Sequence, residues 1–289
     1  MSRSPRLIVS LTSFPARIDV VHLVLESLAA QSRQPDLTVL WLSECQFPGR
    51  EKNLPETLLS FQERGVLIEW TADDLRPHKK YYYAMQKWPD DVIVTVDDDI
   101  ICPPDMLERL WRSYQRWPRA VSTLRAHLIQ FSREGRLQPY RLWRYEYSKL
   151  MHRPSMMLFS TSGAGTLYPP HCMHQELFNK ASIQALCLNA DDLWLKFTQV
   201  MADTPVVLVR RNRKLPYIDG TQGDGLWAEN VNGGQNDVQM QAILEKYDTF
   251  PGAGDSLSSR IRRDEDMHVR NDRSLFRAIV RRIQRMTDR

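Results

Sequence analysis

The first 118 residues alternate between strand-like and helix-like segments, and no other feature restricts the fold as strongly. Each apolar run typical of a strand is followed by a segment whose apolar residues recur at helical spacing. Strands that alternate with helices in this way form a mainly parallel sheet with helices on both faces. We therefore expect an α/β fold in which residues 1–255 form a single domain. The expected strands are 6–11, 37–43, 66–70 and 92–96, and the expected helices are 20–31, 54–65, 78–88 and 103–117.

The pattern is less regular after residue 118. Residues 190–202 have the apolar spacing of a helix. The segment 220–234 is rich in glycine and asparagine, and we expect it to be a loop. Residues 251–254 are interpreted as a hinge before a basic tail. Further strands are expected within 120–131, 156–170 and 204–211.

The composition is that of an ordinary soluble globular protein, with 42% hydrophobic and 26% charged residues. No apolar stretch approaches the roughly 20 residues that a membrane-spanning helix needs. The apolar run at 7–11 is too short for the core of a signal peptide. The four cysteines are scattered without a CxxC spacing, as in reduced cytoplasmic proteins. A net charge of +4 is too small to indicate nucleic acid, so we expect a cytoplasmic protein without a nucleic-acid partner.

The tail at 256–289 is basic, with ten arginines between Arg260 and Arg289. Its last segment, SLFRAIVRRIQRMTDR, places apolar residues at helical spacing with arginines between them. A basic amphipathic helix of this kind can lie on an anionic membrane surface. The alternative is a terminal helix that packs its apolar stripe on the body or on a second subunit.

The stretch VIVTVDDDII places three aspartates directly after a buried strand. Three adjacent carboxylates repel one another unless positive charge lies nearby. Asp97 and Asp99, separated by one residue, can reach one divalent cation, and hard oxygen ligands suit Mg²⁺ or Mn²⁺. Phosphate oxygens of a nucleotide would complete such a site. The alternative is a solvated acidic turn or helix cap before Pro103.

Three polar segments follow strands at the same expected edge of the sheet. TSFPAR follows the first strand, ADDLRPHKK the third, and the aspartate triplet the fourth. In open sheets of this class ligands bind outside the carboxyl ends of the strands. We therefore expect the three segments to converge on one cleft.

The chain resembles GT-A fold glycosyltransferases in four places. VTVDDDI resembles their DxD motif, and SLTSFPARI, DLRPHKKYYYAMQ and ADDLWLK resemble bacterial members that build capsule or lipopolysaccharide O-antigen sugars. The resemblance covers roughly residues 6–240 and implies a GT-A, Rossmann-like domain. It also implies that Asp97 and Asp99 hold Mn²⁺ or Mg²⁺ on the diphosphate of a nucleotide sugar, with Asp98 near the ribose or the sugar.

The resemblance also suggests roles for the neighbouring loops. Thr12, Ser13 and Arg17 would border the nucleoside and phosphate. The alternative is a turn set by Pro15, with Arg17 at the start of a helix. Asp74 would face the base and Lys79 the diphosphate, unless both lie on an exposed turn. Close backbone approach to the donor sugar is expected at the two glycines of SGAGTLYPP, which could equally form a tight turn or bulge: Gly163 and Gly165.

Transfer to a hydroxyl needs a base, and a carboxylate within hydrogen-bond reach suffices. Asp192 is the candidate and Asp191 the second choice, against the alternative of an acidic helix start favoured by the helix dipole. Trp227, in the loop at 220–234, offers a platform for an acceptor sugar, although burial is the commoner fate of tryptophan.

These features lead us to expect a metal-dependent transferase. It would move a sugar from a nucleotide-diphosphate donor, expected to be a UDP-sugar, to a hydroxyl of a bacterial surface glycan, with inversion. The acceptor would be a glycan or lipid-linked glycan at the inner membrane face, where the tail would hold the enzyme. Two alternatives are a sugar nucleotidyltransferase, whose usual glycine-rich phosphate loop is absent from SLTSFPAR, and a non-catalytic scaffold of polysaccharide assembly.

Overall fold

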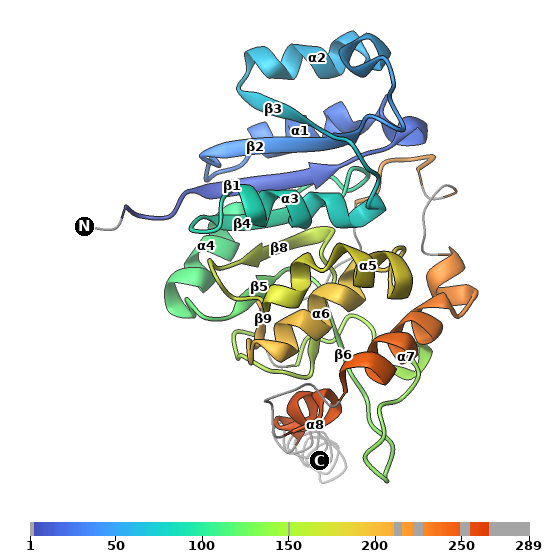
Figure 1. The fold of residues 1–289 in the computed structure, drawn as a ribbon. Helices are drawn as coiled ribbons and strands as arrows, with labels where there is room; N and C mark the ends of the chain where they lie inside the picture. Colours follow the sequence, from blue (N-terminus) through green and yellow to red (C-terminus); the bar gives the residue numbers. More distant parts are fainter. Residues whose placement is uncertain are drawn as a thin grey trace, which may run out of the picture.

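The computed structural model describes residues 3–149, 151–210, 216–221, 223, 228–248 and 255–265. Within these residues a seven-stranded sheet has the order β3-β2-β1-β4-β8-β5-β9, and Figure 1 shows the strands stacked in that sequence. β8 is antiparallel to both of its neighbours, and the other pairs are parallel. The α/β fold with a mainly parallel sheet is therefore confirmed. The strands are β1 Leu7–Thr12, β2 Leu37–Ser43, β3 Val66–Thr71, β4 Val92–Val96, β5 Val121–Thr123, β8 Ala164–Tyr168 and β9 Val206–Leu208.

Helices cover both faces of the sheet. One face packs on α1 (Val21–Ala29), α2 (Glu56–Glu63) and α4 (Met106–Arg116). The other packs on α3 (Lys79–Lys87), α5 (Lys180–Leu186) and α6 (Asp191–Met201), which lie in front of the sheet in Figure 1. Two further helices, α7 (Gln235–Tyr247) and α8 (Leu257–Arg262), complete the described chain. No helix in the described ranges combines the length and apolar character that crossing a bilayer requires.

The central strands are buried on both sides, as parallel strands between two helical layers must be. Alternate residues of β1 face opposite layers because side chains alternate along a strand. Leu7, Val9 and Leu11 pack in the cluster that contains α1, whereas Ile8 packs in the cluster that contains Ala84 of α3. This double burial explains why the strand segments read as continuous apolar runs rather than as alternating ones.

Two of the expected later strands are wrong as single elements. Residues 120–131 contain β5 and a separate strand, β6 (Ala126–Leu128), and residues 156–170 contain β7 (Leu158–Ser160) and β8. β6 pairs with β7 in a second, two-stranded sheet, whereas β5 and β8 belong to the main sheet. The chain thus passes from the main sheet to the second sheet between β5 and β6, and it returns to the main sheet between β7 and β8. Because the residues before and after each of these passages are buried, the apolar pattern of the sequence does not show where one strand ends and the next begins.

The expectation of a loop at 220–234 is also wrong in part. Residues Ala228–Asn232 form a π-helical turn, and Gly234, at φ 71°, immediately precedes α7. Trp227 lies outside the described residues, and so do the expected hinge at 251–254 and the basic helix at 274–289. Of the tail, α8 is described, and its Leu257 and Ile261 are buried in the same cluster as α6.

Asp91 fastens the N-terminal segment to the start of β4. Its carboxylate, in a residue 2% exposed, accepts hydrogen bonds from the backbone N–H of Arg6 at 2.9 Å and from the guanidinium groups of Arg6 and Arg3 at 2.7 to 3.0 Å. We expect Asp91→Ala to lower the free energy of unfolding by roughly 2 kcal/mol, because a buried backbone donor loses its partner. Denaturant unfolding measures this change. The neighbouring Asp90→Ala, at an exposed side chain, is the control, and equal stability of the two variants would contradict the assignment.

Candidate functional site

A cavity of about 950 Å³ opens at the carboxyl edge of the sheet. The segments after β1, β3 and β4 meet there, together with the start of α6. The structure thus brings together most of the side chains singled out in the sequence. The expected site residues that line the cavity are Thr12, Ser13, Arg17, Asp74, Lys79, Asp97, Asp98, Asp99, Gly163, Asp191 and Asp192.

The aspartate triplet begins where the pairing of β4 with β8 becomes irregular. The register shifts between Thr95 and Val96, and the N–H of Asp97 then bonds to the carbonyl of Gly163 at 3.0 Å. A Cβ on Gly163 would lie 1.6 Å from Oδ2 of Asp97, so only glycine permits this approach. The Asp97 side chain is 38% exposed, whereas Asp98 and Asp99 are buried. The irregular pairing therefore turns Asp97 toward the cavity.

Arg17 neutralises the two buried members of the triplet. Its guanidinium lies 2.8 Å from Oδ1 of Asp98 and 3.0 Å from Oδ2 of Asp99, and it also bonds to the carbonyl of Thr221 at 3.0 Å. Ser13 donates to the other oxygen of Asp98 at 2.6 Å. Burial raises the pKa of Asp98, although Arg17 and Ser13 oppose this effect. In this structure Arg17 and Asp98 are therefore engaged with each other, and their expected roles toward a phosphate and a ribose stay predictions.

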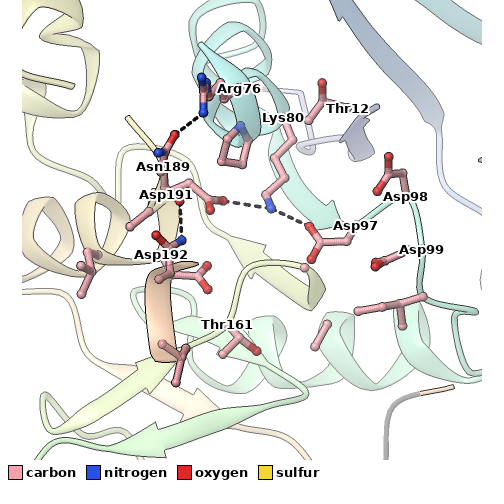
Figure 2. A pocket seen from close by; sticks show the side chains of 18 of the residues that line it. Thr12, Arg76, Lys80, Asp97, Asp98, Asp99, Thr161, Asn189, Asp191 and Asp192 are labelled. Atoms are coloured by element: carbon pink, nitrogen blue, oxygen red, sulfur yellow. Dashed lines mark hydrogen bonds and ion pairs between the residues drawn. The ribbon is translucent and has the colours of Figure 1, made fainter. Parts of the chain in front are cut away.

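Lys80 joins the triplet to the start of α6. Its ammonium lies 2.7 Å from Oδ1 of Asp97 and 2.9 Å from Oδ2 of Asp191, and its side chain is 3% exposed. Figure 2 shows Lys80 extended between these two carboxylates. Burial alone would lower the pKa of Lys80, but Asp191 and Asp97 outweigh it and raise the pKa well above its ordinary value. A buried charge of this kind is stable only when it is paired, so the ion pairs fix both carboxylates in place.

The acidic pair at the start of α6 is held by Ser162. The hydroxyl of Ser162 donates to Oδ2 of Asp191 at 2.8 Å, and its N–H donates to Oδ1 of Asp192 at 2.7 Å. Burial raises the pKa of Asp191, but Lys80 outweighs it and holds the pKa below its usual range. Burial, reinforced by the charge of Asp191, raises the pKa of Asp192 to about 7. The two neighbouring carboxyl groups thus differ in pKa, which lies below its usual range for Asp191 and near 7 for Asp192.

The loop after β3 contributes two further interactions. The ammonium of Lys79 bonds to Asp74, with the Lys79 side chain 2% exposed. Arg76, at the unusual φ of 50°, donates to the amide oxygen of Asn189 at 2.7 Å (Figure 2). Non-glycine residues in this left-handed region are uncommon and often occur at functional sites. The contact links the loop after β3 to the segment before α6 across the cavity.

Two expected binding residues have other contacts. The hydroxyl of Thr12 donates to the carbonyl of Trp41 at 2.8 Å, so it holds neighbouring strands together at the cavity rim. Gly165, at φ 98°, does not line the cavity, and a Cβ there would lie 2.6 Å from the sulfur of Met106. Gly165 therefore serves close packing of β8 on α4, not approach to a ligand.

Lys80, Ser162 and Arg76 were not among the site residues expected from the sequence. Lys80 had a usable signal, because two successive lysines at the start of an apolar helix oppose the helix dipole. Such lysines need anionic partners, and in the structure each of them has one. Ser162 and Arg76 carried no comparable signal, since their roles depend on a turn and a backbone conformation.

The residues at the triplet fit a divalent cation shared with a phosphorylated ligand. Within the described ranges no three His, Cys, Asp or Glu side chains are placed to hold a metal ion together. A cation at the triplet would thus take at most two carboxylates and complete its shell with ligand oxygens and water, which is how Mg²⁺ is usually bound. Lys80 contacts Oδ1 of Asp97, and Oδ2 accepts no hydrogen bond from the residues described, so this oxygen suits a cation.

Comparisons with known structures find distant likeness. A structure of S. aureus TarS 1-349 in complex with UDP is 12% identical, with a TM-score of 0.47, over 83% of this chain and 65% of that one. The same protein in complex with UDP-GlcNAc is 11% identical, with a TM-score of 0.46, over 74% of this chain and 58% of that one. A 4-diphosphocytidyl-2C-methyl-D-erythritol synthase is 13% identical, with a TM-score of 0.44, over 77% of this chain and 96% of that one. The chain thus spans less than two thirds of each of these two TarS structures. The comparison with curated proteins found no match.

A family model gives a firmer result. The model described as glycosyl transferase family 2 matches residues 17–169, which is more than half of the 289 residues. The matched range runs from Arg17 through the aspartate triplet to the end of β8. The chain belongs to glycosyl transferase family 2, whose domain is of the GT-A type.

Proposed function

We propose that this enzyme transfers a sugar from a nucleotide-diphosphate donor, with a UDP-sugar as the first to test, to a hydroxyl of a glycan. The observation that carries the proposal is the position of Lys80, whose ammonium lies within 2.9 Å of carboxylates from both the triplet and the start of α6. A group that could hold a diphosphate and a group that could take a proton therefore face the same cavity. Family membership favours this reading over the nucleotidyltransferase and the scaffold.

A Mg²⁺ or Mn²⁺ ion held by Asp97 and Asp99 would neutralise negative charge on the departing diphosphate. The protein groups prepare the site for it. Lys80 fixes Asp97, and Arg17 fixes Asp99, so neither carboxylate needs to reorganise when the donor binds. Lys79 and Asp74 belong to the segment after β3, which lines the cavity together with the loop after β1. We assign this side of the cavity to the nucleotide.

Asp192 is proposed as the base. Its Oδ1 is held by the N–H of Ser162, which orients the carboxylate toward the cavity. A pKa of about 7 keeps a large fraction of it ionised at neutral pH and still basic enough to accept a proton from the acceptor hydroxyl. Attack by that hydroxyl on the face opposite the leaving diphosphate would invert the anomeric carbon. Asp191, held charged by Lys80, supports the site but is not proposed as the base.

Removing charge at the triplet tests the metal assignment. Asp97→Asn and Asp99→Asn should each weaken Mg²⁺-dependent binding of UDP by roughly 10- to 100-fold, because an amide is a poorer ligand for a hard cation. Calorimetry with and without MgCl₂ measures the effect. Asp105→Asn, at a half-exposed side chain before α4, is the control. Wild-type metal dependence in both variants would remove the cation from the triplet.

The assignment of Asp192 predicts a particular pH dependence. Only the ionised carboxylate accepts a proton, so kcat/KM should rise about tenfold per pH unit below about pH 7 and level off above it. Asp192→Asn should lose about 100-fold or more of the transfer rate and keep its affinity for UDP. Asp203→Asn, beyond the end of the same helix, should behave as wild type. An unchanged rate or a flat profile would place the base elsewhere.

We also propose that the basic tail holds the enzyme at an anionic membrane surface, where a lipid-linked acceptor of a bacterial surface glycan would lie. The support is the sequence of residues 274–289, which contains five arginines among apolar residues at helical spacing.

Deletion of residues 274–289 should lower binding to anionic vesicles by at least about tenfold at low salt, because each arginine near the surface contributes roughly 1 kcal/mol. Vesicle co-sedimentation measures this, with uncharged vesicles as the control. Unchanged binding would indicate that the helix packs on protein.

A further inference from the structure

One wall of the cavity is a ribbon formed by β6 and β7. His127 pairs with Phe159 in this ribbon, and the N–H of Thr161 bonds to the carbonyl of Arg125 at 3.2 Å, which extends the ladder by one pair. Residues opposite each other on antiparallel strands share a face, and so do alternate residues of one strand. Arg125, His127, Phe159 and Thr161 therefore lie on one face, and all four line the cavity. The proposed roles above use none of them.

Two tyrosines on this side of the cavity keep exposed rings. Tyr145 is 39% exposed and Tyr217 is 38% exposed, and both line the cavity. The ring of Tyr145 rests on His127, with 4.7 Å between centroids, and the next residue, Glu146, has the left-handed φ of 49°. A rigidly supported aromatic ring that remains exposed inside a cavity suits the apolar face of a sugar ring.

The same wall carries polar groups without hydrogen-bond partners. Oγ1 of Thr161, in a residue 8% exposed, has no hydrogen-bond partner among the residues described. Nε of Arg125 makes no hydrogen bond either, although it lies at ion-pair distance from Glu146. Buried polar groups normally have partners, and unsatisfied ones at a cavity wall are explained by a ligand that supplies them. Thr161 directly precedes Ser162, which holds Asp192, so a hydroxyl bound here would lie beside the proposed base (Figure 2).

The charge balance indicates which kind of sugar fits. The side chains that line the cavity include six aspartates and five cations, and the negative charge of a diphosphate donor would be offset by the Mg²⁺ or Mn²⁺ proposed at the triplet. Nε of Arg125 lies 3.4 Å from Oε1 of Glu146, so the charge of Arg125 is already balanced. His127 adds none, because burial lowers its pKa to about 3. An acidic sugar would therefore meet no spare positive charge on this wall, whereas an uncharged sugar would find hydroxyl partners.

We propose that Arg125, Tyr145 and Thr161, together with Tyr217, form a subsite for an uncharged sugar ring of the acceptor. The inference rests on the proposed function and narrows its substrate class. Tyr145 supplies the platform, and Thr161 and the pair of Arg125 and Glu146 bond to ring hydroxyls. The subsite orients the acceptor hydroxyl toward Asp192.

The test uses the full-length enzyme saturated with UDP and Mg²⁺. Maltotriose, cellotriose and chitotriose serve as uncharged probes and trigalacturonate as the acidic probe, with affinity measured by ligand-observed NMR titration. At least one uncharged probe should bind more tightly than the acidic one. Tyr145→Ala should weaken its binding about tenfold, and Tyr145→Phe by no more than about twofold. Thr161→Val should weaken it by about fivefold or more, since the hydroxyl is lost at nearly constant shape.

Leu142→Ala is the matched control, because Leu142 is an exposed apolar residue of the same segment that does not line the cavity. UDP affinity should remain at the wild-type value in every variant. Intact UDP binding with unchanged probe affinity in Tyr145→Ala and Thr161→Val would overturn this inference alone. Tighter binding of trigalacturonate, or no binding of any uncharged probe at about 10 mM, would also overturn it. Failure of the wild type to bind UDP would instead overturn the proposed function.

Discussion

The buried ammonium of Lys80 is the interaction on which the site depends. It lies between Asp97, at the end of β4, and Asp191, at the start of α6, and is almost completely removed from solvent. Taking a charge out of water costs several kcal/mol unless excellent partners replace the lost hydration. The two carboxylates provide that replacement, and as a result two segments almost a hundred residues apart in sequence hold a fixed relative position.

The pairing also separates the properties of neighbouring acids. Asp191 and Asp192 are adjacent in sequence, and both accept a hydrogen bond from Ser162. Of these two aspartates, only Asp191 lies at ion-pair distance from Lys80. The pKa of Asp191 therefore falls, and Asp192, half-buried beside the charge of Asp191, has a pKa raised to about 7. Arg17 plays a comparable part for Asp98 and Asp99. Internal cations thus hold the carboxylates of the site in fixed positions and set the difference in pKa between Asp191 and Asp192.

Local patterns predicted much of this architecture. The first four strands and helices follow from apolar periodicity, and the rule that ligands gather at the carboxyl ends of parallel strands correctly placed the segments after β1, β3 and β4 around one cavity. What could not be predicted depends on three-dimensional contacts. Gly163 and Gly165 look alike in sequence, yet the first permits approach to Asp97 and the second permits packing on Met106. Arg125 and Thr161 extend the ribbon of β6 and β7, which is separate from the main sheet. This ribbon depends on pairing between strands far apart in sequence, and the apolar pattern of a single segment carries no information about such pairing.

In the proposed function, the carboxylates after β4 hold a cation and a nucleotide diphosphate in the cavity that Lys80 helps to form. A crystal structure with UDP and Mn²⁺, with data collected for the anomalous signal of manganese, tests this arrangement. We expect one anomalous peak within coordination distance of the phosphate oxygens of UDP and of at least one of Asp97 and Asp99, with the ion pairs of Lys80 retained. Well-ordered UDP in the cavity without manganese at the triplet, or UDP bound elsewhere on the protein, would contradict it.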